Sequence, residues 1–508
     1  MTTQLLLIPE PALKFHYGQS VEDPHDGLTL FGPLDSPRVH GIRVGVVGTP
    51  DGIRRYKKWV TSIQTPIYPP KIKDAMFRPV FPGFQAAFGV KWNVDPEIEL
   101  TVDANELAKT LKEGDKHQRV YRTVDLFANR ILKAKREEEI SVNVWFVVVP
   151  PDVKKYCRPM SKVETEIRTH DETLMHEDTA REFIREPSLF PATNKETIPF
   201  QFEPDFHNQL KARLLLHDAP LQVVNEDTIA PEDFLKSNGF PLRRVDAPST
   251  IAWNLCSTVY YKASGRPWKL SRVREGVCYL GLVFKQDNRS PDPLNACCAA
   301  QMFLDSGDGV VFKGAVGPWY TGERGEFHLS KEAAKEVASI AINSYVSGPP
   351  RRKPPRELFV HGKVRMNDEE WEGFKEAAGT DTNIVGVRIR QDVDLKLFSR
   401  FDYPVPRGTA YFQTERQGYL WSVGFVPRLQ TYLGKEVPNP IFVQITHGRA
   451  MIPRVMQDVL ALTKLNYNAC VFADGAPVTL KFADRVGEIL TAGPIGTDTP
   501  PLPFKFYI

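Results

Sequence analysis

The chain has 508 residues, of which 42% are hydrophobic and 25% charged, and its formal net charge is +3 at pH 7. This length predicts two large domains or three smaller ones, and the composition is that of a globular protein rather than a disordered one. A chain so close to neutral excludes a global basic field, so any nucleic-acid site must be a local basic patch.

No segment approaches the roughly 20 apolar residues that cross a bilayer. The amino-terminal sequence MTTQLLLIPEP has neither the cationic start nor the small-residue cleavage site of a secretory signal. The six cysteines form no CxxC pair and have no histidine partners at zinc-binding spacing, which predicts reduced thiols. Together these features predict a cytoplasmic protein with no membrane-spanning segment.

In the first half of the chain, short apolar runs alternate with helical patterns. Residues 41–49 predict a strand, residues 51–63 a helix, and the continuously apolar residues 142–150 a buried strand. The charged stretch 158–200 predicts surface helices and loops. It is followed by a predicted helix that carries FHNQLKARLLL (206–216) and by a short strand at 219–224.

The second half contains more strands. Successive strands are predicted at 276–285, 301–314 and 316–322, and a helix over 328–348, capped by Ser330 and followed by Gly348. Residues 349–356 are a proline-rich linker. Further strands are expected at 357–364 and 382–390, and further helices at 368–378, 455–465 and 480–490. This alternation predicts two α/β domains that join near residues 260–270.

A possible ligand site begins with His207 and Lys211, which stand four residues apart on one face of the predicted helix. Gln222 follows in the next strand. Residues 247–274 then carry five cations without an acidic residue: Lys262, Arg266, Lys269, Arg272 and Arg274. The same stretch offers Tyr260, Tyr261 and Trp268, rings on which a base could stack. Cations, an amide and aromatic rings suit a phosphate and its nucleotide, although a solvated basic helix face is an equally simple interpretation.

Eight segments, taken in order, carry a family resemblance: GLTLFGPLDS (27–36), RPVFPGF (78–84), HNQLKARLL (207–215), NLCSTVYYKASGRPWKL (254–270), GVCYLGLVFK (276–285), VPNPIFVQITHG (437–448), LTKLNYNACVFADGAPVTLKFADRVGEIL (462–490) and the tail FKFYI. The chain resembles the MID and PIWI domains of a short prokaryotic Argonaute. The resemblance implies an α/β fold: residues 1–262 would hold an N-terminal segment and a Rossmann-like MID domain, residues 263–508 an RNase H-like PIWI domain, and no PAZ domain remains.

In that family the MID domain holds the 5′ phosphate of a guide strand. The resemblance implies that His207 stacks on or bonds to the first nucleotide, that Lys211 and Lys262 neutralise the phosphate, and that Gln222 contributes its amide. Residues 235–250 are then an insertion between Gln222 and Lys262. The resemblance also implies Mg²⁺, held between guide phosphates and the carboxylate of Ile508.

An active PIWI domain needs about four acidic or histidine ligands that hold two metal ions. The resemblance places Val283 (or Leu282) at the first ligand position and Gly362, preceded by His361, at the second. Asp484 alone keeps a carboxylate at an expected position. One carboxylate cannot hold two divalent ions roughly 4 Å apart, so we expect the domain to bind a duplex without cutting it.

Two further carboxylates could replace the missing ligands. Asp305 and Asp308 lie in the sequence SGDG, which is more typical of a turn. A metal-dependent nuclease with such a non-standard ligand set is therefore the main alternative, and a generic nucleotide-binding α/β protein is a third.

The resemblance implies a catalytically inactive short Argonaute that holds a 5′-phosphorylated guide RNA and pairs it with complementary single-stranded DNA. It also implies a heterodimer with a TIR–APAZ protein whose NAD-hydrolysing activity is switched on in defence against plasmids or phage, with oligomerisation after target binding. A SIR2–APAZ protein is the alternative partner.

Overall fold

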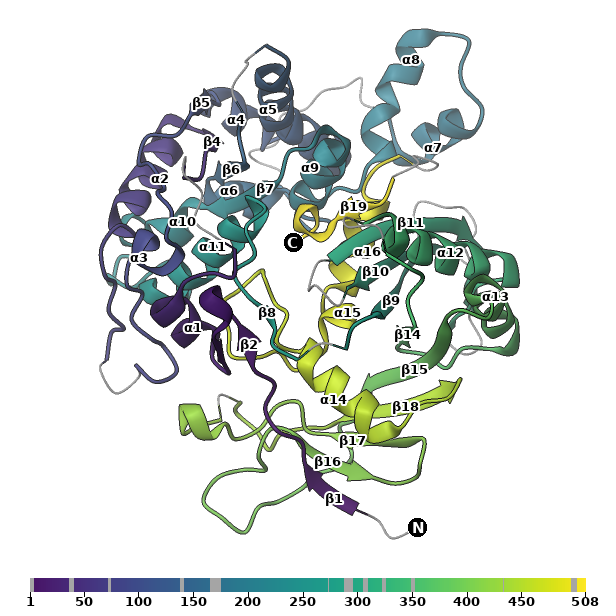
Figure 1. Cartoon of the computed structure of the whole chain (residues 1–508). Coiled ribbons are helices and arrows are strands. Elements are labelled where there is room, and N and C mark those ends of the chain that lie inside the picture. The colour runs from purple at the N-terminus through teal and green to yellow at the C-terminus, as the bar shows by residue number, and fades with distance from the viewer. Residues whose placement is uncertain are drawn as a thin grey trace.

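The computed structural model describes all residues except 1–3, 36–40, 72–74, 138–140, 165–174, 273, 287–295, 305–308, 322–325, 349–351, 433 and 495–499. The described residues form two α/β domains, and the amino-terminal segment runs along both of them (Figure 1). No helix among these residues is long and apolar enough to cross a membrane.

The first domain is built on a parallel sheet. Its strand order is β5 (Ile98–Thr101), β4 (Val44–Gly48), β6 (Val144–Val149) and β7 (Leu221–Asn225). β4 and β6 are buried throughout, as their continuous apolar runs predict.

Helices cover both faces of this sheet. One face packs against α4 (Ala104–Thr110), α5 (Lys116–Glu137) and α9 (Phe206–Leu214). The other packs against α2 (Pro50–Ser62), α3 (Phe84–Phe88) and α11 (Pro248–Lys262). Shorter helices complete the domain: α6 (Pro151–Tyr156), α7 (Glu177–Arg185), α8 (Pro191–Glu196) and α10 (Glu226–Ile229). Parallel strands with helices on both faces are the expected Rossmann-like arrangement.

The second domain is built on a ten-stranded mixed sheet. Its strand order is β1 (Gln4–Leu7), β16 (Thr409–Phe412), β17 (Gln417–Leu420), β18 (Ile441–His447), β15 (Asn383–Gln391), β14 (Glu357–Gly362), β9 (Val277–Gln286), β10 (Ala296–Phe303), β11 (Gly309–Gly317) and β19 (Leu502–Pro503). β9, β10 and β11 are antiparallel, whereas β14 runs parallel to β9 and β15 parallel to β14. This central arrangement is the expected RNase H-like one.

Helices also cover both faces of the large sheet. α12 (Lys331–Ser347) and α13 (Asp368–Ala378) pack on one face. α14 (Ile452–Leu462), α15 (Val478–Lys481) and α16 (Ala483–Thr491) pack on the other. The helix expected at 480–490 is divided at Phe482, whose φ and ψ of −101° and 4° are not helical. Ser330 caps α12 as expected, and its hydroxyl accepts a hydrogen bond from Ala333 N.

The amino-terminal segment connects the two domains. β1 pairs with β16 at one edge of the large sheet, and β2 (Leu13–Lys14) pairs with β3 (Ser20–Val21) and β8 (Lys269–Leu270). The segment then enters α1 (Pro24–Phe31), beside the first domain (Figure 1). Residues 4–7 therefore belong to the second domain's sheet, while the expected division after residue 262 stays a prediction.

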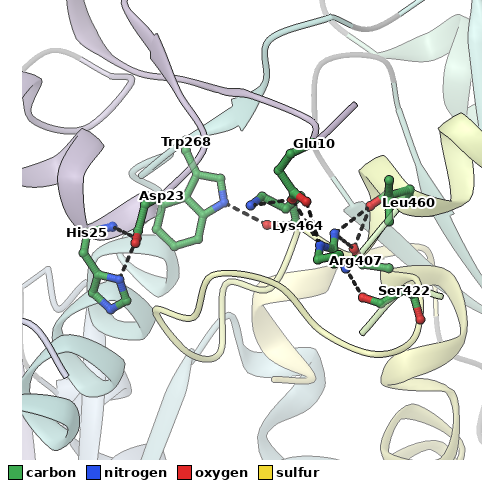
Figure 2. Close-up of polar contacts among 9 residues, drawn as sticks. Glu10, Asp23, His25, Trp268, Arg407, Ser422, Leu460 and Lys464 are labelled. Atoms are coloured by element: carbon green, nitrogen blue, oxygen red, sulfur yellow. Dashed lines mark hydrogen bonds and ion pairs between the residues drawn. The ribbon is translucent and has the colours of Figure 1, made fainter. Parts of the chain in front are cut away.

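A buried ion-pair cluster fixes this segment to the second domain (Figure 2). Glu10 lies 2.9 Å from Arg407 Nε and 3.0 Å from Lys464 Nζ, and the side chains of both cations are almost completely buried. Arg407 also donates to Thr463 Oγ1 at 2.7 Å and to the main-chain oxygen of Ser422. Trp268 Nε1 donates to the main-chain oxygen of Lys464 at 3.2 Å, which ties the interdomain connection to the same cluster.

Candidate nucleic-acid interface

Helix α9 positions the first two predicted ligand residues. Asp205 caps it by accepting a hydrogen bond from Asn208 N at 3.0 Å. Phe206, Leu210 and Leu214 recur at intervals of four and are buried against α5 and the sheet. His207 and Lys211 therefore project together from a different side of the helix.

Lys211 is buried, with 3% of its surface exposed. Its Nζ donates to the main-chain oxygens of Tyr507 at 3.1 Å and Ile508 at 2.7 Å. Burial, followed by charge repulsion from Arg485, lowers the pKa of Lys211 to about 7. The structure thus places Lys211 and Ile508 side by side.

Lys262 is the last residue of α11 and is 1% exposed. Its Nζ donates to the main-chain oxygen of Leu221 at 2.7 Å and to Gln222 Oε1 at 2.8 Å. Burial holds the pKa of Lys262 well below its usual value, and the charge of Lys211 acts in the same direction. The long insertion between Gln222 and Lys262 does not separate their side chains.

His207 lies closer to solvent than the two lysines and lines a cleft. Its Nδ1 is 3.2 Å from Asn208 Oδ1. The loss of solvent around the ring, followed by the charge of Lys211, lowers the pKa of His207. The ring is therefore neutral at pH 7. A neutral ring can stack on a base or exchange a hydrogen bond with a ligand without adding charge.

This cleft, which we call the α9 cleft, has a volume of about 510 Å³ and lies beside the carboxyl ends of β6 and β7, where Val149, Val223 and Asn225 line it. Ligands of doubly wound α/β domains bind outside the carboxyl ends of the strands. Sequence reasoning missed three cations in its lining: Lys154, Arg158 and Arg485. Lys154 and Arg158 follow a buried strand at a spacing of four residues, and that signal could have found them. Asp205 and Glu488 also line the cleft.

A second hollow, which we call the β14 pocket, lies at the end of β14. Val283, Gly362 and Asp484, far apart in the sequence, line it together. Gly281, two residues before Val283, packs so tightly against α15 that a Cβ there would lie 2.0 Å from Thr479 O. The three positions named for metal ligands thus converge in space. Asp484 lies 3.2 Å from Lys363 Nζ.

The other proposed ligands lie elsewhere. His361 is 1% exposed and its Nδ1 is 2.9 Å from Thr479 Oγ1; burial lowers its pKa to about 3. Asp305 and Asp308 lie outside the described residues. Among the residues that the structure describes, no group of three or more His, Cys, Asp and Glu side chains is arranged to hold a metal ion.

The donor atoms around Lys211 and Lys262 suit Mg²⁺ in type. They are oxygens of Tyr507, Ile508, Leu221 and Gln222. Mg²⁺ prefers oxygen ligands and completes its octahedron with water and phosphate oxygens. Here each of these oxygens also accepts a hydrogen bond from an ammonium group, so a metal ion and the lysines would share them.

Solved structures with the same arrangement of domains are Argonaute and Piwi proteins. Clostridium butyricum Argonaute bound to a guide DNA and a 19-mer target DNA matches with a TM-score of 0.64 and 13% identity, over 100% of this chain and 55% of its own. The chain has an Argonaute-like fold. Drosophila Piwi gives a TM-score of 0.58 at 12% identity, covering 99% of this chain and 56% of its own. Aquifex aeolicus Argonaute gives a TM-score of 0.55 at 13% identity, covering 100% of this chain and 57% of its own.

The Argonaute-like chain thus spans little more than half the length of these structures. No family model matches it, and no curated protein sequence does either. The α9 cleft is lined by residues of both domains, since Arg485 and Glu488 belong to α16, and the β14 pocket lies in the second domain.

Proposed function

We propose that this chain binds a guide strand by its 5′ phosphate and uses the guide to recognise a complementary single strand. The observation that carries this proposal is the pair of buried ammonium groups on Lys211 and Lys262, whose hydrogen bonds go to main-chain and amide oxygens. Burying two positive charges is unfavourable unless anions compensate them, and the only carboxylate proposed beside this pair is that of Ile508. A phosphate would supply further negative charge, and His207 would meet the first base.

The two lysines are not in the lining of the α9 cleft, whereas His207, Arg158 and Arg485 are. The 5′ phosphate would therefore enter at His207 and join, or replace, the main-chain oxygens now bonded to Lys211. Mg²⁺ bound there by a carboxylate at Ile508 would supply additional positive charge to the phosphate. Affinity would come from phosphate contacts and specificity from base pairing.

The experiment that tests this proposal is to purify the protein from cells and identify the nucleic acid that accompanies it. We expect small RNAs that carry a 5′ phosphate, and we expect His207→Ala with Lys211→Ala to remove them. Lys133→Ala with Lys335→Ala is the matched control, because both lysines are exposed and line neither hollow. Retention of the same RNAs by the His207/Lys211 variant would contradict the proposal, and a chain purified without nucleic acid would favour a generic nucleotide-binding protein.

We propose further that the β14 pocket does not cleave the target. Val283 and Gly362 cannot ligate a metal ion through their side chains, and the carboxylate at the third expected ligand position, Asp484, pairs with Lys363. Incubating the guide-loaded protein with target and Mn²⁺ tests this. Cleavage that Asp484→Ala abolishes would instead support the alternative, a metal-dependent nuclease with a non-standard ligand set.

The effector belongs to this proposal as well. A cytoplasmic complex of this chain with a TIR–APAZ protein would couple target recognition to NAD⁺ hydrolysis by the partner, in defence against plasmids or phage. Co-expressing the chain with a TIR–APAZ or a SIR2–APAZ protein and measuring NAD⁺ after addition of target DNA distinguishes the two. Size-exclusion chromatography of the same complex with and without target DNA shows whether it oligomerises.

A further inference from the structure

The α9 cleft has an acidic side that the proposed function does not use. Asp205 and Glu488 line the cleft. Glu203 adjoins Asp205, whose main-chain N–H donates to the main-chain oxygen of Glu203 at 2.8 Å. Glu203 Oε2 also accepts a hydrogen bond from Asn208 Nδ2 at 3.5 Å. We call Glu203, Asp205 and Glu488 the acidic side of the cleft.

The three carboxylates of the acidic side are close enough to repel one another. Burial, followed by the charge of Asp205, raises the pKa of Glu203 to about 7, and the charge of Glu488 acts in the same direction. Burial also raises the pKa of Asp205, and Glu488 again adds to the effect. Lys285 lies 3.6 Å from Glu488 and offsets part of this negative charge. A further anion placed beside the acidic side would add to the repulsion.

The carboxylates and the cations of the cleft belong to the same two helices. Asp205 caps α9 and stands two positions before His207 and six before Lys211. In α16, Glu488 follows Arg485 by three residues, so the two side chains share one face of the helix. A phosphate held near His207, Lys211 and Arg485 would therefore have carboxylates within about one helical turn of it.

The cations behind the cleft suit one phosphate group. A phosphomonoester carries about −1.5 to −2 charges at pH 7, which the buried ammonium groups of Lys211 and Lys262 match. A 5′-triphosphate adds two further phosphate groups, which would extend into the rest of the cleft. Arg158 also lines the cleft, but the carboxylate of Asp205 already interacts with its charge. The additional phosphates would thus meet carboxylates before they meet a free cation.

We propose that Asp205 and Glu488 restrict the α9 cleft to guides with a single 5′ phosphate and exclude a 5′-triphosphate by charge repulsion. This inference rests on the proposed function, because it assumes that the 5′ end of a guide lies in the cleft. It also defines the reaction that supplies the guide. A primary transcript begins with a triphosphate, so the guide must come from hydrolysis of a phosphodiester bond in a longer RNA that leaves a 5′ phosphate, or from hydrolytic removal of pyrophosphate.

The test measures the affinity of the protein for one RNA guide with a 5′ hydroxyl, monophosphate or triphosphate, by fluorescence anisotropy in EDTA with the label at the 3′ end. We expect a preference for the monophosphate over the triphosphate of about five- to thirtyfold, the effect of one or two like charges about 4 Å away in water. Asp205→Asn with Glu488→Gln should abolish or reverse this preference, because the triphosphate then meets only cations. Asparagine also caps helices, so α9 is retained. The wild-type preference should shrink as salt screens the repulsion.

Asp95→Asn with Glu137→Gln is the matched control, because both carboxylates are exposed and line neither hollow. Equal affinity of the wild-type protein for monophosphate and triphosphate guides would overturn the inference. So would a preference that the Asp205/Glu488 variant shares with the control, since the shape of the cleft would then cause it. Tighter triphosphate binding on addition of Mg²⁺ that this variant loses would also overturn it, because the carboxylates would then hold a metal ion. Equal affinity for hydroxyl and monophosphate guides would instead refute the proposed function on which the inference rests.

Discussion

Lys262 Nζ lies 2.8 Å from Gln222 Oε1, although 40 residues separate them in the sequence. The contact forms because α11 ends beside β7, so that Lys262 also reaches the main-chain oxygen of Leu221. This junction places two buried lysines, Lys211 and Lys262, close enough for their charges to interact. A pocket with this charge is costly when empty and favourable when it holds a phosphate.

Replacing a buried lysine should therefore affect binding more than stability. We expect Lys211→Met or Lys262→Met to change the free energy of unfolding by no more than about 1–3 kcal/mol, because the removal of a buried charge offsets the hydrogen bonds that the neighbouring oxygens lose. The same variants should lose affinity for a 5′-phosphorylated guide. Urea denaturation and guide titration measure the two effects. A large loss of stability together with unchanged guide affinity would show that these lysines are structural.

Guide binding should take up protons. The pKa of Lys211 is about 7 in the free pocket, so at pH 8 much of it is neutral, and a phosphate beside it raises that pKa again. The complex then holds more protons than the free protein, and affinity falls as the pH rises above 7. Calorimetric titrations at pH 8 in two buffers of different ionisation enthalpy measure the uptake. Lys211→Met should reduce it, and an identical uptake in that variant would disprove this origin.

How much of this site the sequence could predict depends on the distance between the contributing residues. The helix spacing of His207 and Lys211 is local, and the structure keeps it. The same holds for the valine-rich strands β4 and β6 and for the cap of α12. Each depends on residues that are close together in the sequence, so each was predictable. Spacing along the chain could not show that Lys262 reaches Gln222, because tertiary packing closes that loop.

The β14 pocket and the amino-terminal segment show the same limit. Positions 283, 362 and 484 were named through a resemblance, and only the fold shows that they line one pocket. Lys363 and Arg365, which also line it, were overlooked because isolated surface cations carry no pattern. The pairing of residues 4–7 with β16 joins segments about 400 residues apart, for which composition and periodicity give no signal.

The buried cluster around Glu10 should control the stability of the second domain. Glu10→Gln leaves Arg407 and Lys464 buried without their carboxylate, and we expect a loss of about 3–5 kcal/mol. Asp26→Asn, which breaks the exposed pair with Arg428, is the control and should cost no more than about 1 kcal/mol. Chemical denaturation of both variants measures the difference. Equal losses would contradict a dominant role for the buried cluster.

Changing the chain end tests the role proposed for Ile508. Ile508 is 4% exposed and its main-chain oxygen is 2.7 Å from Lys211 Nζ. Adding a Gly-Ser-Gly extension after Ile508 converts its carboxylate to a peptide group, and we expect this to abolish any stimulation of guide binding by Mg²⁺. Guide titrations with Mg²⁺ and with EDTA give the readout. Undiminished stimulation in the extended protein would exclude Ile508 as a ligand.

The α9 cleft and the two lysines behind it are proposed to hold a 5′ phosphate, and one comparison tests this role without any substitution. It measures the affinity of the wild-type protein for one RNA guide that carries either a 5′ phosphate or a 5′ hydroxyl. Because hydrogen bonds to charged groups contribute about 1.5–3 kcal/mol each, we predict at least a roughly tenfold preference for the phosphate. Equal affinity for the two guides would contradict this role for the cleft and its lysines.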